Sequence, residues 1–211
     1  VTGALSQEAA ALTGLCPGTP VVGGAGDNAA AAVGTGVVKT GRAFTTIGTS
    51  GVVFAHADSV TIDPLGRVHT FCHAVPGSWA VMSCTLAAGL SLKWFRDTFC
   101  RAEIETAAGL PYLMGERSPL LDENARGAFI GLSAMHTKYD LLRAVMEGVA
   151  YSQRQCLDVL RGMRISFSEM LACGGGGRSA FWRQMLADVY GCPVSTIASS
   201  GESAALGAAI L

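Results

Sequence analysis

Runs of apolar residues alternate with glycine-rich and polar segments, so the chain is predicted to form a succession of short helices and strands. Apolar residues at helical spacing mark the helices, and β-branched or aromatic runs mark the strands. The longest helix, at 139–161, is amphipathic, with Val145, Val149 and Ser152 on one side. The other helices are expected at 4–15, 86–99, 180–190 and 202–211, besides one after Asp27. The strands are expected at 21–22, 43–47, 52–55, 68–74, 79–83, 127–132, 167–172 and 193–197.

The glycine-rich stretch from Gly23 to Gly36 follows the apolar pair Val21–Val22. It predicts a strand, a tight turn and a helix, because glycine permits the turn and the alanines favour the helix. Asp27 stands at the start of that helix, where the helix N-terminus favours an ionised carboxylate. The residues alone leave two interpretations open: Asp27 either caps the helix or accepts a hydrogen bond from a substrate hydroxyl.

A hairpin is predicted at residues 43–55, with Gly48-Thr49-Ser50-Gly51 at its tip. This tip is small and polar, and it offers backbone N–H groups and two hydroxyls that can contact phosphate oxygens. An ordinary hairpin turn explains the same four residues equally well, so the motif alone does not decide between the two interpretations.

A second glycine run, Gly174–Gly177, follows the strand at 167–172 and opens the helix at 180–190. A strand, a glycine turn and a helix N-terminus together make a pocket for polar or anionic groups. A dinucleotide-binding motif does not explain the run. Its G-x-G-x-x-G spacing is not met, and no acidic residue ends a strand about 20 residues later.

Composition narrows the classes of partner. The 211 residues carry a net charge of −1 without a basic run, which argues against nucleic acid as a partner. The longest apolar run, 79–92, is too short to span a bilayer, so no membrane partner is expected. The first residues lack a basic start, so we expect no signal peptide.

The seven cysteines show no CxxC pair, which predicts free thiols in a reducing, cytoplasmic environment.

Two pairs of charged or titratable residues are candidate sites. His69 and His73 lie four apart on a predicted strand, about 13 Å, which is too far for one metal ion. We expect structural roles for both and no metal site. Glu116 and Arg117 are expected to brace a loop through an ion pair, with a direct catalytic role as the alternative.

Several motifs together resemble those of the FGGY carbohydrate kinases. The segment Gly24-Ala25-Gly26-Asp27-Asn28-Ala29 is similar to the catalytic segment of that family, in the form found in its xylulokinase members. The resemblance extends from about Gly14 to Leu211, although the stretch at 101–110 is shorter than in family members. The matching segments are 24–29, 48–51, 71–79, 110–119, 127–147 and 173–188.

The resemblance implies an α/β fold of the RNase H-like type, shared with actin and the Hsp70 ATPase domain, with a mixed sheet flanked by helices. It further implies that residues 1–211 form the C-terminal nucleotide-binding domain of an FGGY-type sugar kinase whose N-terminal domain is absent from the chain. The implied reaction is ATP-dependent phosphorylation of a small-molecule sugar, D-xylulose, with Mg²⁺ beside ATP. A homodimer is also expected, and the isolated chain is expected to be inactive.

The resemblance assigns roles to individual residues. Asp27 would be the catalytic base that faces the sugar hydroxyl, and so also a substrate contact. The positions implied to contact ATP are Gly48 and Thr49 at the phosphates, and Gly89, Lys93, Gly175, Gly176 and Ser179 at the nucleoside. Two alternatives remain. One is an FGGY kinase that acts on ribulose, gluconate or glycerol, and the other is an ATP-binding switch or chaperone-type module of the same superfamily.

Overall fold

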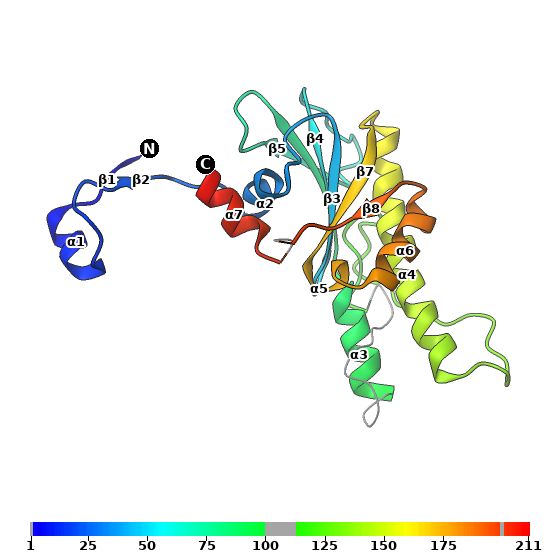
Figure 1. Ribbon diagram of the computed structural model, residues 1–211. Coiled ribbons are helices and arrows are strands. Elements are labelled where there is room, and N and C mark those ends of the chain that lie inside the picture. Colours follow the sequence, from blue (N-terminus) through cyan, green and yellow to red (C-terminus); the bar gives the residue numbers. More distant parts are fainter. Residues whose placement is uncertain (1, 100–112, 199–200) are drawn as a thin grey trace.

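The computed structural model describes residues 2–99, 113–198 and 201–211, and its centre is a mixed β-sheet with helices on both faces (Figure 1). Among these residues the strands are β1 (Gly3–Ala4), β2 (Pro20–Val21), β3 (Gly41–Ile47), β4 (Gly51–Ala57), β5 (His69–Cys72), β6 (Trp79–Thr85), β7 (Phe167–Cys173) and β8 (Val194–Ser195). The helices are α1 (Gln7–Thr13), α2 (Asp27–Thr35), α3 (Gly89–Phe99), α4 (Lys138–Gly162), α5 (Gly174–Gly177), α6 (Ala180–Tyr190) and α7 (Ser203–Ile210).

The sheet has the strand order β5-β6-β4-β3-β7-β8. The short connection at Gly48–Ser50 makes β3 and β4 antiparallel, as predicted for a hairpin. In contrast, β7 follows the long helix α4, and this crossover places it parallel to β3, with Thr46 opposite Cys173. Because β3 and β7 are parallel, Ile47 and Cys173 end at the same edge of the sheet.

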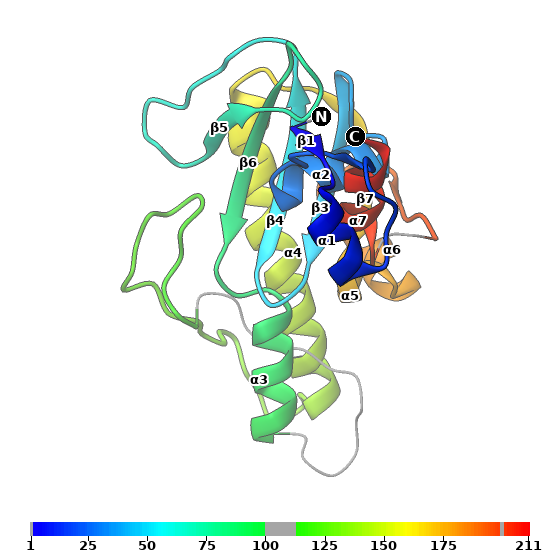
Figure 2. The ribbon, with the colours of Figure 1, turned by 90° about the vertical axis from the view of Figure 1, so that its left-hand side faces the viewer.

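Each face of the sheet packs against its own pair of helices (Figure 1). On one face, α4 and α6 bury apolar residues such as Leu157 and Leu186 against the sheet, and the predicted apolar side of α4 is confirmed by the burial of Val149. On the other face, α2 packs over Phe44 and Phe54, whose rings stack 4.9 Å apart. Figure 2 shows that α3 and the first part of α4 extend together beyond the edge of the sheet.

Helices α2 and α7 approach each other unusually closely. A Cβ atom added at Gly207 would lie 1.7 Å from the carbonyl oxygen of Ala30, and one added at Gly34 would lie 2.0 Å from that of Ser203. Backbone therefore packs directly on backbone, and only glycine fits at either position. This contact fixes α7 against the helix that begins at Asp27.

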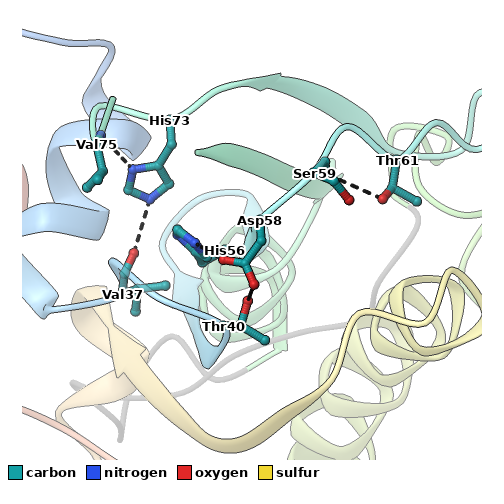
Figure 3. Close-up of polar contacts among 8 residues, drawn as sticks. All are labelled: Val37, Thr40, His56, Asp58, Ser59, Thr61, His73 and Val75. Atoms are coloured by element: carbon teal, nitrogen blue, oxygen red, sulfur yellow. Dashed lines mark hydrogen bonds and ion pairs between the residues drawn. The ribbon is translucent and has the colours of Figure 1, made fainter. Parts of the chain in front are cut away.

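Two buried histidines hold the loop between α2 and β3 (Figure 3). His73 Nε2 lies 3.0 Å from the carbonyl oxygen of Val37, while its Nδ1 accepts a hydrogen bond from the backbone N–H of Val75. Since Nδ1 is an acceptor, Nε2 carries the proton and the ring is neutral. His56 Nε2 pairs with Asp58, and Asp58 in turn accepts a hydrogen bond from Thr40 in the same loop. His73 therefore has a structural role, as expected from the sequence, and His56 has a similar one.

Strands β1 and β2 and helix α1 form an arm that projects from the α2–α7 side of the body (Figure 1). The expected helix is present and capped by Ser6, whose side chain accepts a hydrogen bond from the N–H of Ala9. The expected strand before the glycine-rich stretch, however, pairs with β1 in this arm rather than joining the central sheet. Leu12 and Leu15 on the arm are exposed.

One predicted strand is absent, and helix α3 is one of the elements whose predicted bounds differ from the structure. The segment 127–132 contains no strand, because Phe129 packs on Phe95 with ring centroids 6.1 Å apart while Ile130 remains exposed. Helix α3 begins at Gly89 rather than Leu86. The stretch at 101–110, predicted to be shorter than in family members, lies outside the described residues. None of the helices in the described part of the chain is both long and apolar enough to cross a bilayer.

Candidate active site

A cavity of about 740 Å³ lies at the edge of the sheet where β3 and β7 end, on the side of α4 and α6. It is formed by the hairpin tip, the start of α3, the first half of α4 and the glycine run that precedes α6. All seven positions expected to contact ATP line it. These are Gly48, Thr49, Gly89, Lys93, Gly175, Gly176 and Ser179.

The hairpin tip is fixed to the beginning of α3 by three backbone hydrogen bonds. Thr49 O accepts from the N–H groups of Ala88 (3.0 Å) and Leu90 (3.1 Å), and Gly48 O accepts from that of Gly89 (2.7 Å). These bonds explain why α3 starts at Gly89. The close approach also explains why residue 89 is glycine, because a Cβ atom added there would lie 2.5 Å from the carbonyl oxygen of Gly48. The carbonyl side of the tip is therefore engaged by protein, while Thr49 still lines the cavity.

The glycine run is a single helical turn, α5, rather than an open loop. A Cβ at Gly176 would come within 2.6 Å of the side chain of Ile47, whereas one at Gly175 would meet no protein atom. Gly176 thus allows the turn to pack on β3, and Gly175 leaves its own surface open to the cavity. Ser179 Oγ accepts a hydrogen bond from the N–H of Trp182 and so caps α6.

The remaining wall of the cavity combines two cations with an apolar surface. Lys93 and Arg96 lie one turn apart on α3, and Arg96 pairs with Asp97. The sequence predicts a helix here and the resemblance places Lys93 at the nucleoside, but no sequence signal indicates that α4 and α6 supply the apolar side. That side is made by Leu92, Leu142, Met146, Phe181 and Trp182.

Asp27 lines a separate cavity of about 430 Å³ on the opposite face of the sheet, between α2 and the start of α7. The structure shows that α2 begins at Asp27 itself and that Gly26 occupies the N-cap position, so the interpretation of Asp27 as the N-cap is wrong. The exposed carboxylate accepts hydrogen bonds through Oδ1 from the backbone N–H of Asn28 (2.8 Å) and from its side chain (3.2 Å). The cavity also contains Glu202.

The two cavities meet at the ends of the parallel strands. Thr46 lines the smaller cavity and Ile47 the larger one, and the same division falls between Gly174 and Gly175. Asp27 is therefore not in one cavity with the seven other residues but across the strand ends from them. Crevices beyond the carboxyl ends of parallel strands are common ligand sites in α/β proteins.

Glu116 braces a loop beside this site, although not through the expected ion pair. Its buried Oε1 accepts hydrogen bonds from the backbone N–H groups of Leu86 (2.9 Å) and Arg117 (2.7 Å). Burial raises the pKa of this carboxyl, and the two amide hydrogen bonds oppose the rise. The side chain thus holds the turn between β6 and α3, which leads directly to the cavity.

Comparison with known proteins gives consistent results. Residues 106–211 match the model of the "FGGY family of carbohydrate kinases, C-terminal domain". The chain is 40% identical over 225 residues to the xylulose kinase of Escherichia coli K12, covering all of this chain and 46% of the relative. It is 35% identical over 233 residues to a gluconokinase of Bacillus subtilis, covering 98% of this chain and 45% of that relative.

Among solved structures, a "xyloylose kinase" from Brucella ovis superimposes with a TM-score of 0.88 at 38% identity, covering 99% of this chain and 46% of that one. This likeness confirms the expected fold, a mixed sheet flanked by helices of the kind that sugar kinases share with actin and Hsp70. The chain spans a little under half the length of the relatives it matches. Because the family model covers half of the sequence, the chain belongs to the FGGY family of carbohydrate kinases.

Proposed function

We propose that this chain is the nucleotide-binding half of a kinase that transfers the γ-phosphoryl group of ATP to the 5-hydroxyl of D-xylulose. The observation that carries the proposal is the arrangement at one sheet edge. A cavity lined by glycine backbone and two cations lies on one side of the strand ends, and the exposed carboxylate of Asp27 lies on the other. The xylulose kinases among the relatives favour D-xylulose as the sugar.

In this proposal Asp27 accepts the proton of the sugar hydroxyl as that oxygen attacks the γ-phosphorus. Phosphoryl transfer proceeds through a loose transition state, so the attacking oxygen carries little charge and its orientation matters more than the strength of the base. A positioned base is typically worth about 10²–10⁴-fold in rate. The bonds from Asn28 to Oδ1 fix the orientation of the carboxylate toward the cavity.

The nucleotide occupies the larger cavity in the same proposal. Its base and ribose lie between the apolar wall of α4 and α6 and the open backbone of Gly175. Its phosphates run along the tip at Gly48 and Thr49, past the ends of β3 and β7, toward Asp27. Gly89 and Lys93 on α3 and Gly176 and Ser179 before α6 complete the walls.

Magnesium enters the proposal only as the companion of ATP. The described residues contain no group of three or more His, Cys, Asp or Glu side chains able to hold a metal ion. Mg²⁺ bound with ATP usually relies on phosphates, water and one or two carboxylates. The proposal assigns no step to Mg²⁺.

A coupled assay for ADP release tests the proposal. The chain would be joined to an amino-terminal half of the kind its relatives carry, and D-xylulose, D-ribulose, D-gluconate and glycerol would be compared as acceptors. We expect D-xylulose to give the highest kcat/KM. We expect Asp27→Asn to lower kcat at least about 10²-fold while the Kd for ATP stays within about two-fold. Activity of Asp27→Asn within a few-fold of the parent would remove Asp27 from the mechanism.

The gluconokinase relative supports one alternative, a kinase for another sugar or sugar acid. Preference for D-gluconate in the same panel would select it. ATP binding without transfer to any acceptor would select the switch or chaperone-type module instead. A homodimer and a cytoplasmic location, both expected from the sequence, stay predictions.

A further inference from the structure

Gln153 occupies the centre of a buried polar cluster between β3, α4 and α6. Its side chain is fully buried, and its Oε1 accepts hydrogen bonds from Thr45 Oγ1 (2.6 Å) and from the hydroxyl of Tyr190 (2.7 Å). Its Nε2 donates to the carbonyl oxygen of Thr46 at 3.3 Å. One carboxamide therefore connects the last residues of β3 to α4 and to the end of α6.

The same side chain also limits where the hairpin can lie. A Cβ added at Gly51 would lie 2.2 Å from Gln153 Nε2 and 2.5 Å from Thr85 Oγ1, so the first residue of β4 rests directly on these two polar groups. Gln153 thus contacts both strands at the base of the hairpin, through Thr46 on β3 and Gly51 on β4. The tip, Gly48–Ser50, lies between these two points.

Helix α4 carries Gln153 in line with part of the cavity wall. Leu142 and Met146 line the cavity, and Gln153 follows Met146 by seven residues, which places all three along one side of the helix. The helix therefore presents an apolar wall to the cavity and, two turns later, a hydrogen-bonding group to the hairpin. The distance between wall and hairpin tip is fixed by one rigid element.

We propose that Gln153 is a positioning residue that holds the hairpin tip at the height required for nucleotide binding. The inference rests on the proposed role of the larger cavity. A buried carboxamide specifies one arrangement more strictly than an apolar side chain of equal size, because an unpaired polar group in the interior is costly. The bond to Thr46 O needs a donor, and a carboxylate in its place would face that carbonyl oxygen with a second acceptor.

Tyr190 provides a matched control. Its hydroxyl donates to the same Oε1 from the end of α6 and also interacts with Thr45, whereas the bond from Gln153 to Thr46 O does not involve it. Tyr190→Phe removes one bond of the cluster and leaves the link to Thr46 in place. Gln153→Leu removes every bond of the carboxamide at similar volume, and Gln153→Glu removes mainly the bond to Thr46 O.

The test compares the three variants with the parent in the intact protein. The Kd for ATP is followed by the fluorescence of Trp182, which lines the cavity, and amide hydrogen exchange is followed at residues 47–51. We expect Gln153→Leu and Gln153→Glu to weaken ATP binding at least ten-fold and to accelerate exchange in the hairpin. We expect Tyr190→Phe to stay within two-fold in both, and the KM for the sugar to be unchanged throughout.

Each of the other possible outcomes would contradict either the role of Gln153 or the proposed function. Equal losses in Tyr190→Phe and Gln153→Leu would show that the cluster only stabilises the core and would overturn the inference. Unchanged exchange and affinity in both Gln153 variants would overturn it as well. A parent protein that does not bind ATP would refute the proposed function, and with it any nucleotide role for Gln153. Exchange in the hairpin would still report whether Gln153 holds that segment.

Discussion

At the scale of single residues, the contact between Gly34 and Gly207 has the sharpest energetic consequence. Each glycine lies where a Cβ would overlap a backbone oxygen of the facing helix. A backbone atom cannot rotate away as a flexible side chain can, so a methyl group there forces the helices apart. Separation would also displace the walls of the cavity that holds Asp27, since α2 and α7 both line it.

We predict that Gly207→Ala lowers the free energy of unfolding by about 2 kcal/mol or more, as expected for overpacking against backbone. Gly162→Ala is the matched control, because an added Cβ there meets nothing and the residue ends helix α4. We expect its stability to be unchanged or raised by at most about 1 kcal/mol. Chemical denaturation monitored by circular dichroism measures both, and similar values for the two variants would contradict the prediction.

Residues that occupy a motif with a backbone requirement are the ones that the sequence predicts best. The glycines of the hairpin and of the run before α6 were identified in this way, and their proposed contacts with ATP stay predictions. Prediction failed where a side chain had several available partners. Glu116 was expected to pair with Arg117 but bonds backbone amides instead, because the turn at Leu86 leaves an N–H that a buried acceptor must satisfy. Gln153 gave no signal, since its partners lie 37 and 108 residues away.

At the scale of elements, the hairpin, helix α4 and the β7–α6 unit were predicted correctly because each has strong local signals. The strand expected at 127–132 failed, although it contains strand-forming residues. β propensity expresses packing on a pleated surface, and Phe129 finds its partner in the ring of Phe95 instead of a neighbouring strand. The sequence could not show this, because the contact depends on where α3 lies.

The loop after α2 gives a pH-dependent prediction. His73 must be neutral, since Nδ1 accepts a bond from Val75, and burial lowers the pKa of His73, with the neighbouring His56 acting in the same direction. The unfolded chain therefore binds a proton below about pH 6.5 that the folded protein excludes. The contribution of His73 to stability is complete above that pH and is lost progressively as the pH falls through the window below it.

We expect the free energy of unfolding of the parent to rise between pH 5 and pH 7.5, and the rise to be smaller in His73→Asn, which cannot titrate. Burial, aided by Arg117, also lowers the pKa of His69. Part of the pH dependence of the free energy of unfolding should therefore remain in His73→Asn. Denaturant titrations at several pH values would measure both slopes. Identical slopes would show that His73 is not the group responsible.

At the scale of the whole molecule, the arm of β1, α1 and β2 adds little to the folded body. Its strands pair with each other, and Ala10 is the buried apolar residue within it. We predict that deletion of residues 1–19 shifts the Tm of the remaining chain by less than about 2 °C, because almost no core is removed. Scanning calorimetry provides the measurement, and a fall of 5 °C or more would show that the arm packs on the body in solution.

The division of the candidate site between two faces of the sheet is a property of the whole fold. Asp27 and the glycine run Gly174–Gly177 each come from a segment that predicts a strand, a turn and a helix. No local sequence pattern predicts that α2 covers one face of the sheet while α4 and α6 cover the other. That arrangement follows from the parallel crossover between β3 and β7, which depends on contacts distant in sequence.

The attachment of the hairpin tip to α3 has a consequence for how this part of the cavity wall can move. Three backbone hydrogen bonds join Gly48 and Thr49 to the first turn of α3. A swinging hairpin would have to break all three and leave their donors unsatisfied, which is costly where water is scarce. Any movement of the hairpin tip that preserves these bonds therefore carries the first turn of α3 with it, and with α3 the side chains of Lys93 and Arg96.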